Sequence, residues 1–433
     1  MSEHANFSVP PSGQANEATG RYIITFRDNV LTEGISILRS RAGVTRLANA
    51  ADFQASALSM EQLDAAGGAV FPNLGVAAVS LDEDALTQMM SCAGEDSSIL
   101  AVEPERVFYA INDELPVDYL EGYRDAANDL YQKIVMKTPC EAGNGTAAAF
   151  ADDAQSSWGL KGTKVTSSRY TGKGIRVAVL DTGMDLRHPD FKGRSIISKS
   201  FVPGEDVQDE HRHGTHCVGI ACGYQDLNGQ RYGVAYESTI YVGKVLSNAG
   251  KGNSSWILAG MEWAISNQCQ VISMSLGNKV LTPSTAYETI GRRALENGCL
   301  VIAAAGNHRQ KVANPPGTVG QPANSPSIMA VAATDRKSQL ASFSGSSGSD
   351  LGANVDIAAP GVDVYSSVPM NQGRYDRLNG TSMATPHVAG IAALYSQAYD
   401  VRGPLLWLYL IWQTKRMSLP SADVGSGLVQ APQ

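Results

Sequence analysis

The chain has 433 residues, of which 43% are hydrophobic and 18% are charged, with 43 glycines and a formal net charge of −8. This length exceeds what one hydrophobic core fills, so a large and a small domain are expected, and the composition excludes a disordered or fibrous protein. No apolar run approaches the ~20 residues that cross a bilayer. The strongest run, residues 404–412, is predicted to be a buried helix.

Residues 1–20 form a polar tail that lacks the basic start and the apolar stretch of a secretory signal peptide. We therefore expect a cytoplasmic protein, with signal-independent export left open. No membrane partner is expected.

The cysteines have neither zinc-site spacing nor the spacing of a small disulfide framework. There are six of them: Cys92, Cys140, Cys217, Cys222, Cys269 and Cys299. Most are expected to be reduced core residues. A disulfide between Cys269 and Cys299, which each open an apolar run, is the less favoured alternative.

Charge is unevenly distributed along the chain. Residues 82–157 contain 16 acidic and 4 basic side chains, whereas residues 158–433 carry a net positive excess. Opposite signs favour association of these two parts, and salt weakens that association. A solvated acidic linker explains the composition equally well. The positive excess is small and has no basic cluster with interleaved aromatic residues, so nucleic acid is not expected as a partner.

The first folded segment, residues 21–110, is predicted to be a small α+β domain of ferredoxin-like type. Its expected elements are a strand, a helix, a strand, a helix and an extended segment: residues 21–26, 31–41, 76–81, 82–90 and 99–109. Acidic residues open the second helix, where the positive end of the helix dipole favours them. Pro104 is expected to bend or end the extended segment.

A boundary region and a large domain follow. Residues 111–157 combine an expected amphipathic helix, residues 118–137, with a linker rich in Ala, Gly and Asp. In residues 158–433, helical segments separate five short apolar runs: 175–180, 240–245, 271–276, 300–305 and 328–332. This alternation predicts an α/β domain with a doubly wound parallel sheet, whose functional site lies at the carboxyl ends of the strands.

Three segments of this domain carry candidate catalytic residues. Asp181 directly follows an apolar strand, His213 precedes a glycine at an expected helix start, and Ser382 lies at the mouth of an apolar helix. The free N–H groups at such a helix start favour developing negative charge. Each residue alone has an ordinary structural explanation. Together they supply a nucleophile, a general base and a carboxylate that orients the base.

These segments resemble the active-site signatures of the subtilisin-like serine proteases. The matching stretches read Asp-Thr-Gly from Asp181, His-Gly-Thr-His from His213, and Gly-Thr-Ser-Met-Ala-Thr-Pro around Ser382, in the family's chain order. The resemblance implies a serine endopeptidase in which Asn307, at the end of another strand, donates a hydrogen bond to the oxyanion. The alternative is a catalytically silent protein that keeps the fold. Its mark would be a broken triad, and all three members are present.

The resemblance also implies a substrate-binding edge and a pocket. Ser275, Leu276 and Gly277 would pair with the backbone of a protein or peptide substrate by strand addition. Residues 300–307 and 318–320 would form the walls of the pocket for the residue before the scissile bond.

Two features leave the preference of this pocket open. Gly320, which has no side chain, is expected to leave the pocket deep and suited to large apolar residues, although Asn278 stands where the family usually has a second glycine. If His308 or Arg309 leaned over the pocket, an acidic residue would gain a charge-assisted partner. We favour the apolar alternative, with both basic side chains in solvent.

Residues 21–110 look like the inhibitor-type propeptide of this family, so the chain is expected to be a zymogen that its own N-terminal domain inhibits. Self-cleavage is predicted after Tyr109 or Ala110, with a second cut possible within residues 138–157. If the pocket were basic, cleavage after Glu103, Glu105 or Glu114 would compete with cleavage after Tyr109 or Ala110.

Cofactors and the remaining histidines and cysteine are also interpreted through the resemblance. The chemistry needs no cofactor, but structural calcium is left open: many relatives use an Asp at the position of Asp190, whereas the short loop 226–233 here contains Arg231, which would repel a cation. His216 and His387 are expected to be structural. Cys217 resembles the free cysteine of the proteinase K branch and is expected to be buried near His213.

Overall fold

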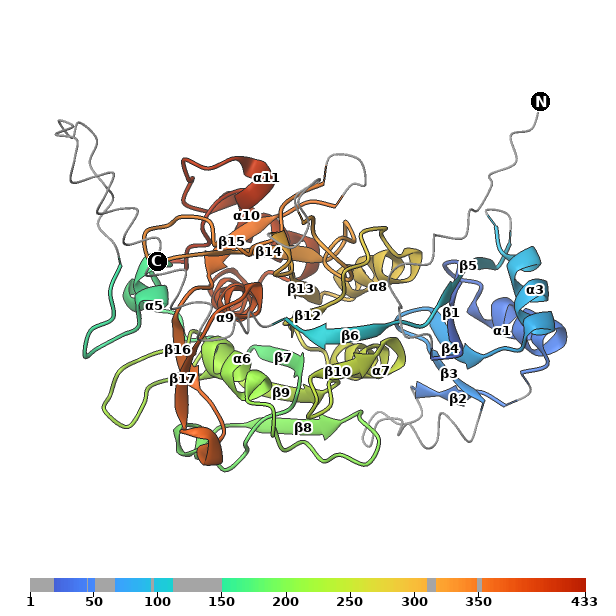
Figure 1. The fold of residues 1–433 in the computed structure, drawn as a ribbon, viewed down its shortest axis with the longest axis horizontal. Helices are drawn as coiled ribbons and strands as arrows, with labels where there is room; N and C mark the ends of the chain where they lie inside the picture. Colours follow the sequence, from blue (N-terminus) through green and yellow to red (C-terminus); the bar gives the residue numbers. More distant parts are fainter. Residues whose placement is uncertain are drawn as a thin grey trace, which may run out of the picture.

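The computed structural model describes residues 19–44, 46–50, 67–94, 97–111, 150–309, 317–348 and 353–433. Most of the polar tail, the helix expected over residues 118–137, the first part of the linker after it and Cys140 lie outside the described residues. Figure 1 shows a larger part built around one sheet and a smaller part beside it, joined by an extended strand.

A seven-stranded parallel sheet forms the centre of the larger part (Figure 1). Its strands are β7 (Arg176–Asp181), β8 (Ile196–Ser200), β9 (Thr239–Lys244), β11 (Val271–Met274), β13 (Leu300–Ala304), β14 (Met329–Thr334) and β15 (Ile357–Pro360). They are ordered β15-β14-β13-β11-β7-β9-β8, and every pairing is parallel. The predicted doubly wound α/β sheet is confirmed.

Helices cover both faces of this sheet. They are α5 (Trp158–Gly162), α6 (His213–Cys222), α7 (Ser254–Ser266), α8 (Thr285–Glu296), α9 (Thr381–Tyr399), α10 (Gly403–Trp412) and α11 (Ser421–Val424), with one-turn segments η2 (Val165–Ser167), η3 (Pro189–Phe191) and η5 (Met370–Gln372). On β7, Ala178 and Leu180 join the core under α7 and α8, whereas Val177 and Val179 join the core under α6 and α9. Because both faces are buried, the strands have continuous apolar sequences.

The smaller part is a five-stranded sheet with two helices on one face. Its elements are β1 (Arg21–Phe26), α1 (Leu31–Ala42), β2 (Ala48–Asn49), β3 (Gly68–Phe71), β4 (Val76–Ser80), α3 (Glu83–Cys92) and β5 (Ile99–Pro104). The strand order is β2-β3-β4-β1-β5. Asp82 caps α3 by accepting the N–H of Ala85 at 2.8 Å, which explains the acidic helix start in the sequence.

The two faces of the small sheet have different partners. Ile24 packs with Leu38 of α1 and Met89 of α3, in a core of its own. Ile23 and Phe71 face the opposite way and belong to the core that contains α7 and α8. One face of the small sheet therefore packs against its own helices α1 and α3, and the other packs against α7 and α8 of the larger part.

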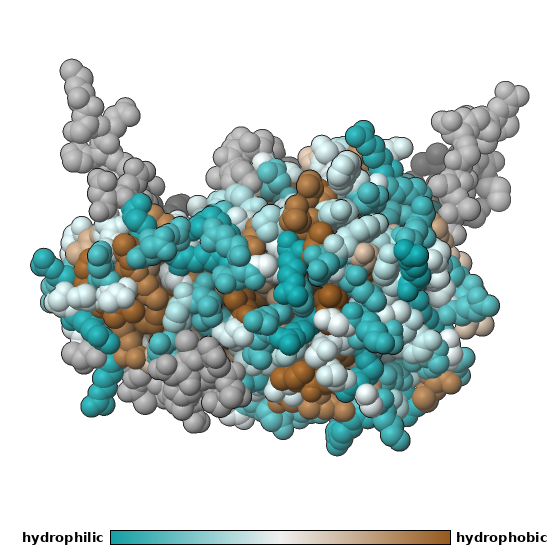
Figure 2. Space-filling view, turned by 180° about the vertical axis from the view of Figure 1, so that it is seen from behind, coloured by the Kyte–Doolittle hydropathy of each residue, from teal (hydrophilic) through white to brown (hydrophobic). Residues whose placement is uncertain are grey.

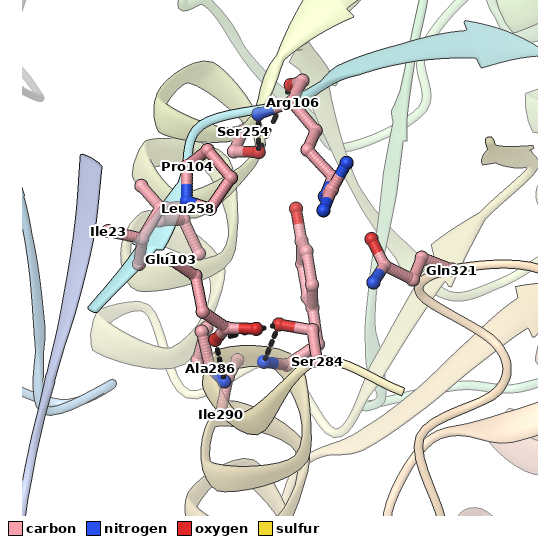
Figure 3. Close-up of a pocket in the computed structure, with 11 residues that line it drawn as sticks. Ile23, Glu103, Pro104, Arg106, Ser254, Leu258, Ser284, Ala286, Ile290 and Gln321 are labelled. Carbon is pink, nitrogen blue, oxygen red and sulfur yellow. Dashed lines mark hydrogen bonds between the residues drawn. The ribbon is translucent and has the colours of Figure 1, made fainter. Parts of the chain in front are cut away.

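Two carboxylates, one near the end of β5 and one just after it, accept hydrogen bonds at the starts of α8 and α7. Glu103 accepts the N–H of Ala286 at 2.8 Å and the hydroxyl of Ser284 at 3.1 Å, as Figure 3 shows in the small pocket at this junction. Glu105 accepts the N–H of Ser255 at 2.8 Å. Both carboxylates lie at helix N-termini, where the free N–H groups and the dipole favour negative charge.

Strand β6 (Val107–Ala110) continues from this junction into the larger part (Figure 1). It lies between β10 (Lys251–Asn253) and β12 (Leu276–Gly277), in the strand order β10-β6-β12. Both pairings are antiparallel. The remaining strands are β16 (Val364–Ser367) and β17 (Tyr375–Leu378), which form a hairpin before α9.

Helix α10 differs from the prediction. It was expected to be buried, but only one side of it packs against the molecule: Leu406 and Leu410 are buried, while Leu405, Leu408 and Trp412 are 58%, 46% and 73% exposed. Figure 2 shows the molecule from behind, with apolar patches separated by polar side chains. Among the described residues, no helix is both long enough and apolar enough to span a bilayer.

Candidate active site

The three candidate catalytic residues come from three elements that end or begin at one edge of the parallel sheet. Asp181 ends β7, His213 begins α6 and Ser382 is the second residue of α9. Asp181 Oδ1 lies 2.6 Å from His213 Nδ1, and all three side chains are buried. Ser382 Oγ donates to the carbonyl of Ser275 at 3.0 Å. His213 Nε2 makes no hydrogen bond to any described residue, so it is available to accept a proton.

The electrostatics of His213 suit a base that becomes charged during the reaction. Burial opposes a charge on the ring, but the interactions with Asp181 and Cys217 together outweigh burial and raise the pKa of His213 well above its ordinary value. Asp181 also accepts the N–H of Thr182 at 2.7 Å, which fixes the carboxylate. The pair can therefore stabilise an imidazolium.

Neighbouring residues behave as the sequence predicted. Burial lowers the pKa of His216 to about 3 and that of His387 to about 4, so both rings are neutral. His216 Nε2 lies 3.0 Å from the carbonyl of Val364 and His387 Nδ1 lies 2.8 Å from that of Met383, which are structural contacts. The five described cysteines are free, so the alternative of a disulfide between Cys269 and Cys299 is wrong.

One group in the described part of the chain has the spacing of metal ligands: Asp181, His213 and Cys217. Cys217 Sγ lies 3.9 Å from His213 Nδ1, and burial raises the pKa of its thiol, so the sulfur keeps its proton. Metal binding requires the thiolate. Since Nδ1 of His213 is also hydrogen-bonded to Asp181, this group suits proton transfer rather than metal binding.

The side-chain amide of Asn307, the predicted oxyanion donor, has a fixed orientation. Its Oδ1 accepts from the N–H and the hydroxyl of Thr381, both at 2.9 Å, which turns its Nδ2 towards the carbonyl oxygen of Ile111 at 3.4 Å. Gly380 permits this approach, because a Cβ there would lie 2.9 Å from the Ile111 oxygen. Its φ of 151° is also one that side-chain-bearing residues rarely adopt.

The chain's own segment occupies the predicted substrate-binding edge. Leu276 pairs with Ala110, Gly277 pairs with Tyr109, and the carbonyl of Ser275 accepts the N–H of Ile111 at 3.3 Å. The opposite edge, β10, was not predicted; next to it, the carbonyl of Gly250 accepts the N–H of Ala110 at 2.9 Å. The Gly-Lys-Gly stretch before α7 was the available signal for that edge.

The carbonyl next to Asn307 Nδ2 belongs to Ile111. It is not that of Tyr109 or Ala110, the residues after which self-cleavage was predicted; that prediction stays a prediction. Tyr109 is 40% exposed and lies under Lys251 Nζ, 5.7 Å from its ring centroid, so it fills no pocket. The strand alternation buries Phe108 instead, against the ring of Tyr287 at 5.4 Å.

Gly320 and His308 also differ from their predicted roles. A Cβ at Gly320 would lie 2.1 Å from the backbone oxygen of Asn278, so the glycine permits a close backbone approach. His308 was expected in solvent, but it is buried with Nε2 2.5 Å from the carbonyl of Thr318. Its Cε1 lies 3.8 Å from that same Cβ position. The ring of His308 therefore lies beside Gly320, in the predicted wall of the pocket.

The other acidic or basic candidates lie elsewhere. Arg309 is partly buried and pairs with Asp423 at 2.5 Å, so it was wrongly expected in solvent. Glu103 and Glu105 bind helix starts rather than the cleft. Glu114 lies outside the described residues.

The sequence of residues 172–419 matches the model of the subtilase family, Peptidase S8. The chain belongs to the subtilase family. This subtilase is 46% identical over 237 residues to a subtilisin of Bacillus pumilus, covering 54% of this chain and 81% of that protein. It is 42% identical over 285 residues to subtilisin Savinase of Lederbergia lenta, covering 63% of this chain and 96% of that protein. With subtilisin E of Bacillus subtilis (strain 168) the identity is 46%, over 54% of this chain and 58% of that protein.

The family and these relatives make this subtilase a serine endopeptidase.

Proposed function

We propose that this subtilase hydrolyses peptide bonds through an acyl-enzyme on Ser382 and is made as a zymogen that its N-terminal domain inhibits. One observation carries the proposal most strongly. The backbone of β6 runs through the substrate-binding edge and brings the carbonyl oxygen of Ile111 to 3.4 Å from Asn307 Nδ2, while Asn307 Oδ1 accepts the N–H of Thr381, the residue before Ser382.

The proposed reaction begins with proton transfer from Ser382 Oγ to His213 Nε2 while Oγ attacks the substrate carbonyl carbon. The hydroxyl must first turn from the carbonyl of Ser275, its present acceptor, towards His213. Asn307 Nδ2 and the N–H of Ser382 then hold the oxyanion. Asp181 keeps the proton on Nδ1 and stabilises the imidazolium.

The tetrahedral intermediate collapses when His213 gives its proton to the leaving amine. A water molecule then attacks the ester carbonyl of Ser382, with His213 again as the base, and releases the acid product. These side chains supply every proton transfer, so no cofactor is needed for the chemistry.

Inhibition by the N-terminal domain is supported by the contacts that hold this domain against α7 and α8. Besides the two carboxylates at the helix starts, Glu262 of α7 accepts the N–H groups of Asn73 and Leu74 at 3.1 and 3.2 Å. Asp28 pairs with Arg293 of α8 at 2.7 Å. This ion pair is half-exposed, so raised salt should weaken the inhibition only modestly.

The bond between Ile111 and Asn112 is the proposed processing site. Intact-mass analysis and N-terminal sequencing of the wild type beside Ser382→Ala test it. We expect a mature chain that begins at Asn112, before any second cut within residues 138–157, and an uncut Ser382→Ala chain. A mature chain that begins at Ala110 or Ile111 would contradict the assigned bond, and processing of Ser382→Ala at the wild-type rate would contradict the role of Ser382.

A further inference from the structure

A partly buried cluster of two carboxylates and three tyrosines joins segments that are far apart in the sequence. Asp190 of η3 accepts the hydroxyl of Tyr232 on Oδ2 at 2.6 Å and the hydroxyl of Tyr375 on Oδ1 at 2.9 Å. Asp226 accepts the hydroxyl of Tyr365 at 2.9 Å. The cluster therefore ties η3 and the loop after α6 to the β16–β17 hairpin.

Further oxygens in and next to the loop also accept hydrogen bonds. The second oxygen of Asp226 accepts the N–H groups of Asn228 and Gln230 at 2.8 and 2.9 Å. The guanidinium of Arg231 donates to the carbonyls of Gly233 at 3.2 Å and Val234 at 3.0 Å. The guanidinium of Arg231 thus supplies the positive charge that these carbonyls bind.

Calcium, which the family resemblance left open at Asp190, does not fit this donor set. The ion takes six to eight oxygen ligands, mostly carboxylates and carbonyls with free lone pairs facing it. Both Asp190 oxygens already face tyrosine O–H groups, and a dication near Arg231 would be repelled.

The tyrosines are well suited to replace an ion. Burial raises the pKa of Tyr232 well above its ordinary value, so its hydroxyl remains a donor throughout the neutral pH range. The rings also pack together: Tyr365 stacks on Tyr375 at 5.6 Å between centroids, and Tyr375 meets His188 edge-on at 5.6 Å. Because packing already fixes the rings, their hydroxyls lose little conformational entropy when they donate to the carboxylates.

We propose that the cluster of Asp190, Asp226, Tyr232, Tyr365 and Tyr375 takes the place of a calcium ion at this position and holds the three segments together without metal. We name it the tyrosine clasp. Its position gives it a role near the reaction centre, because β17 leads directly into the residues before Ser382. On the same strand, Asp376 pairs with Arg212, the neighbour of His213, at 2.6 Å.

Thermal unfolding of the full chain tests the tyrosine clasp, with Ser382→Ala as the background so that self-digestion does not interfere. We expect the same Tm, within about 1 °C, with excess calcium and with excess EDTA. Tyr232→Phe and Tyr375→Phe should each lower Tm by about 3 to 6 °C under both conditions, since each removes one hydrogen bond to a carboxylate.

Tyr224→Phe is the matched control. Tyr224 lies in the same loop, but it is 40% exposed and stacks on Tyr236. Removing its hydroxyl should leave the Tm within about 1 °C of that of the Ser382→Ala background. Two results would overturn the proposal: a rise of more than about 5 °C with calcium that Asp190→Asn abolishes, or Tm values of Tyr232→Phe and Tyr375→Phe equal to that of Tyr224→Phe.

Discussion

Replacing Glu262 with alanine should weaken the binding of the N-terminal domain to the mature enzyme. The side chain is 2% exposed and its carboxylate accepts three N–H groups: those of the Asn73 and Leu74 backbones and the side-chain amide of Asn73, the last at 2.8 Å. Alanine leaves these donors without an acceptor. Each unsatisfied buried donor costs about 1 to 3 kcal/mol, and water entering beside Asn73 reduces part of that cost.

A total of about 2 to 4 kcal/mol corresponds to a roughly 30- to 700-fold weaker inhibition constant. The assay adds separately made residues 1–111 to the mature enzyme and measures hydrolysis of a short peptide. The fragment is identical in every measurement, so any cost of ordering it cancels.

Ser266→Ala is the control for this assay. Its hydroxyl accepts from the Asn73 side chain at 3.0 Å, in a partly exposed contact, so only a few-fold loss is expected. An inhibition constant for Glu262→Ala within about twofold of the wild type would refute the reasoning.

Three further predictions concern the chemistry and the pH dependence. Ser382→Ala and His213→Ala should abolish labelling by a fluorophosphonate probe and reduce peptide hydrolysis by several orders of magnitude; labelling of Ser382→Ala at normal strength would contradict the assignment. Asn307→Ala should lower kcat by roughly 100- to 1000-fold with little change in KM, and an unchanged kcat would remove it from the oxyanion site. Burial raises the pKa of Asp356 to about 7 from 3.8, so its ionisation costs stability as pH rises between these values. In the Ser382→Ala background, Asp356→Asn should therefore raise Tm relative to Asp356 more at pH 8 than at pH 4, and a difference independent of pH would contradict this.

Much of the fold could be predicted because local patterns and global packing agree. The apolar runs of β7, β11 and β13 are continuous because helices cover both sheet faces, and that pattern also places Asp181 at a strand end. The candidate triad could be found from three short segments, since each residue type has a specific chemical task. Hydrogen bonds of Asn307 to Thr381 could not be read from spacing, although the residue itself could.

The missed features depend on distances across the fold. Which carbonyl meets Asn307 depends on the register of β6 along β12, and Ile111 is two residues beyond Tyr109 and one beyond Ala110. The role of Gly320 depends on the backbone of Asn278, which approaches from another segment. For α10, an apolar sequence all around the helix suggested burial, but α8 and α9 contact only one side of it.

The divided packing of the small sheet has a consequence for activation. Ile23, Phe71 and Val76 are buried in the core shared with α7 and α8, not in the one beneath α1 and α3. Once cut and released, the fragment would expose this apolar face to water and lose a large share of what keeps it folded. Unfolded chains are the form that proteases digest, so the free enzyme would degrade the fragment that we propose as its inhibitor. Release would then be irreversible. It would begin slowly and accelerate as more free enzyme becomes available to digest the fragment.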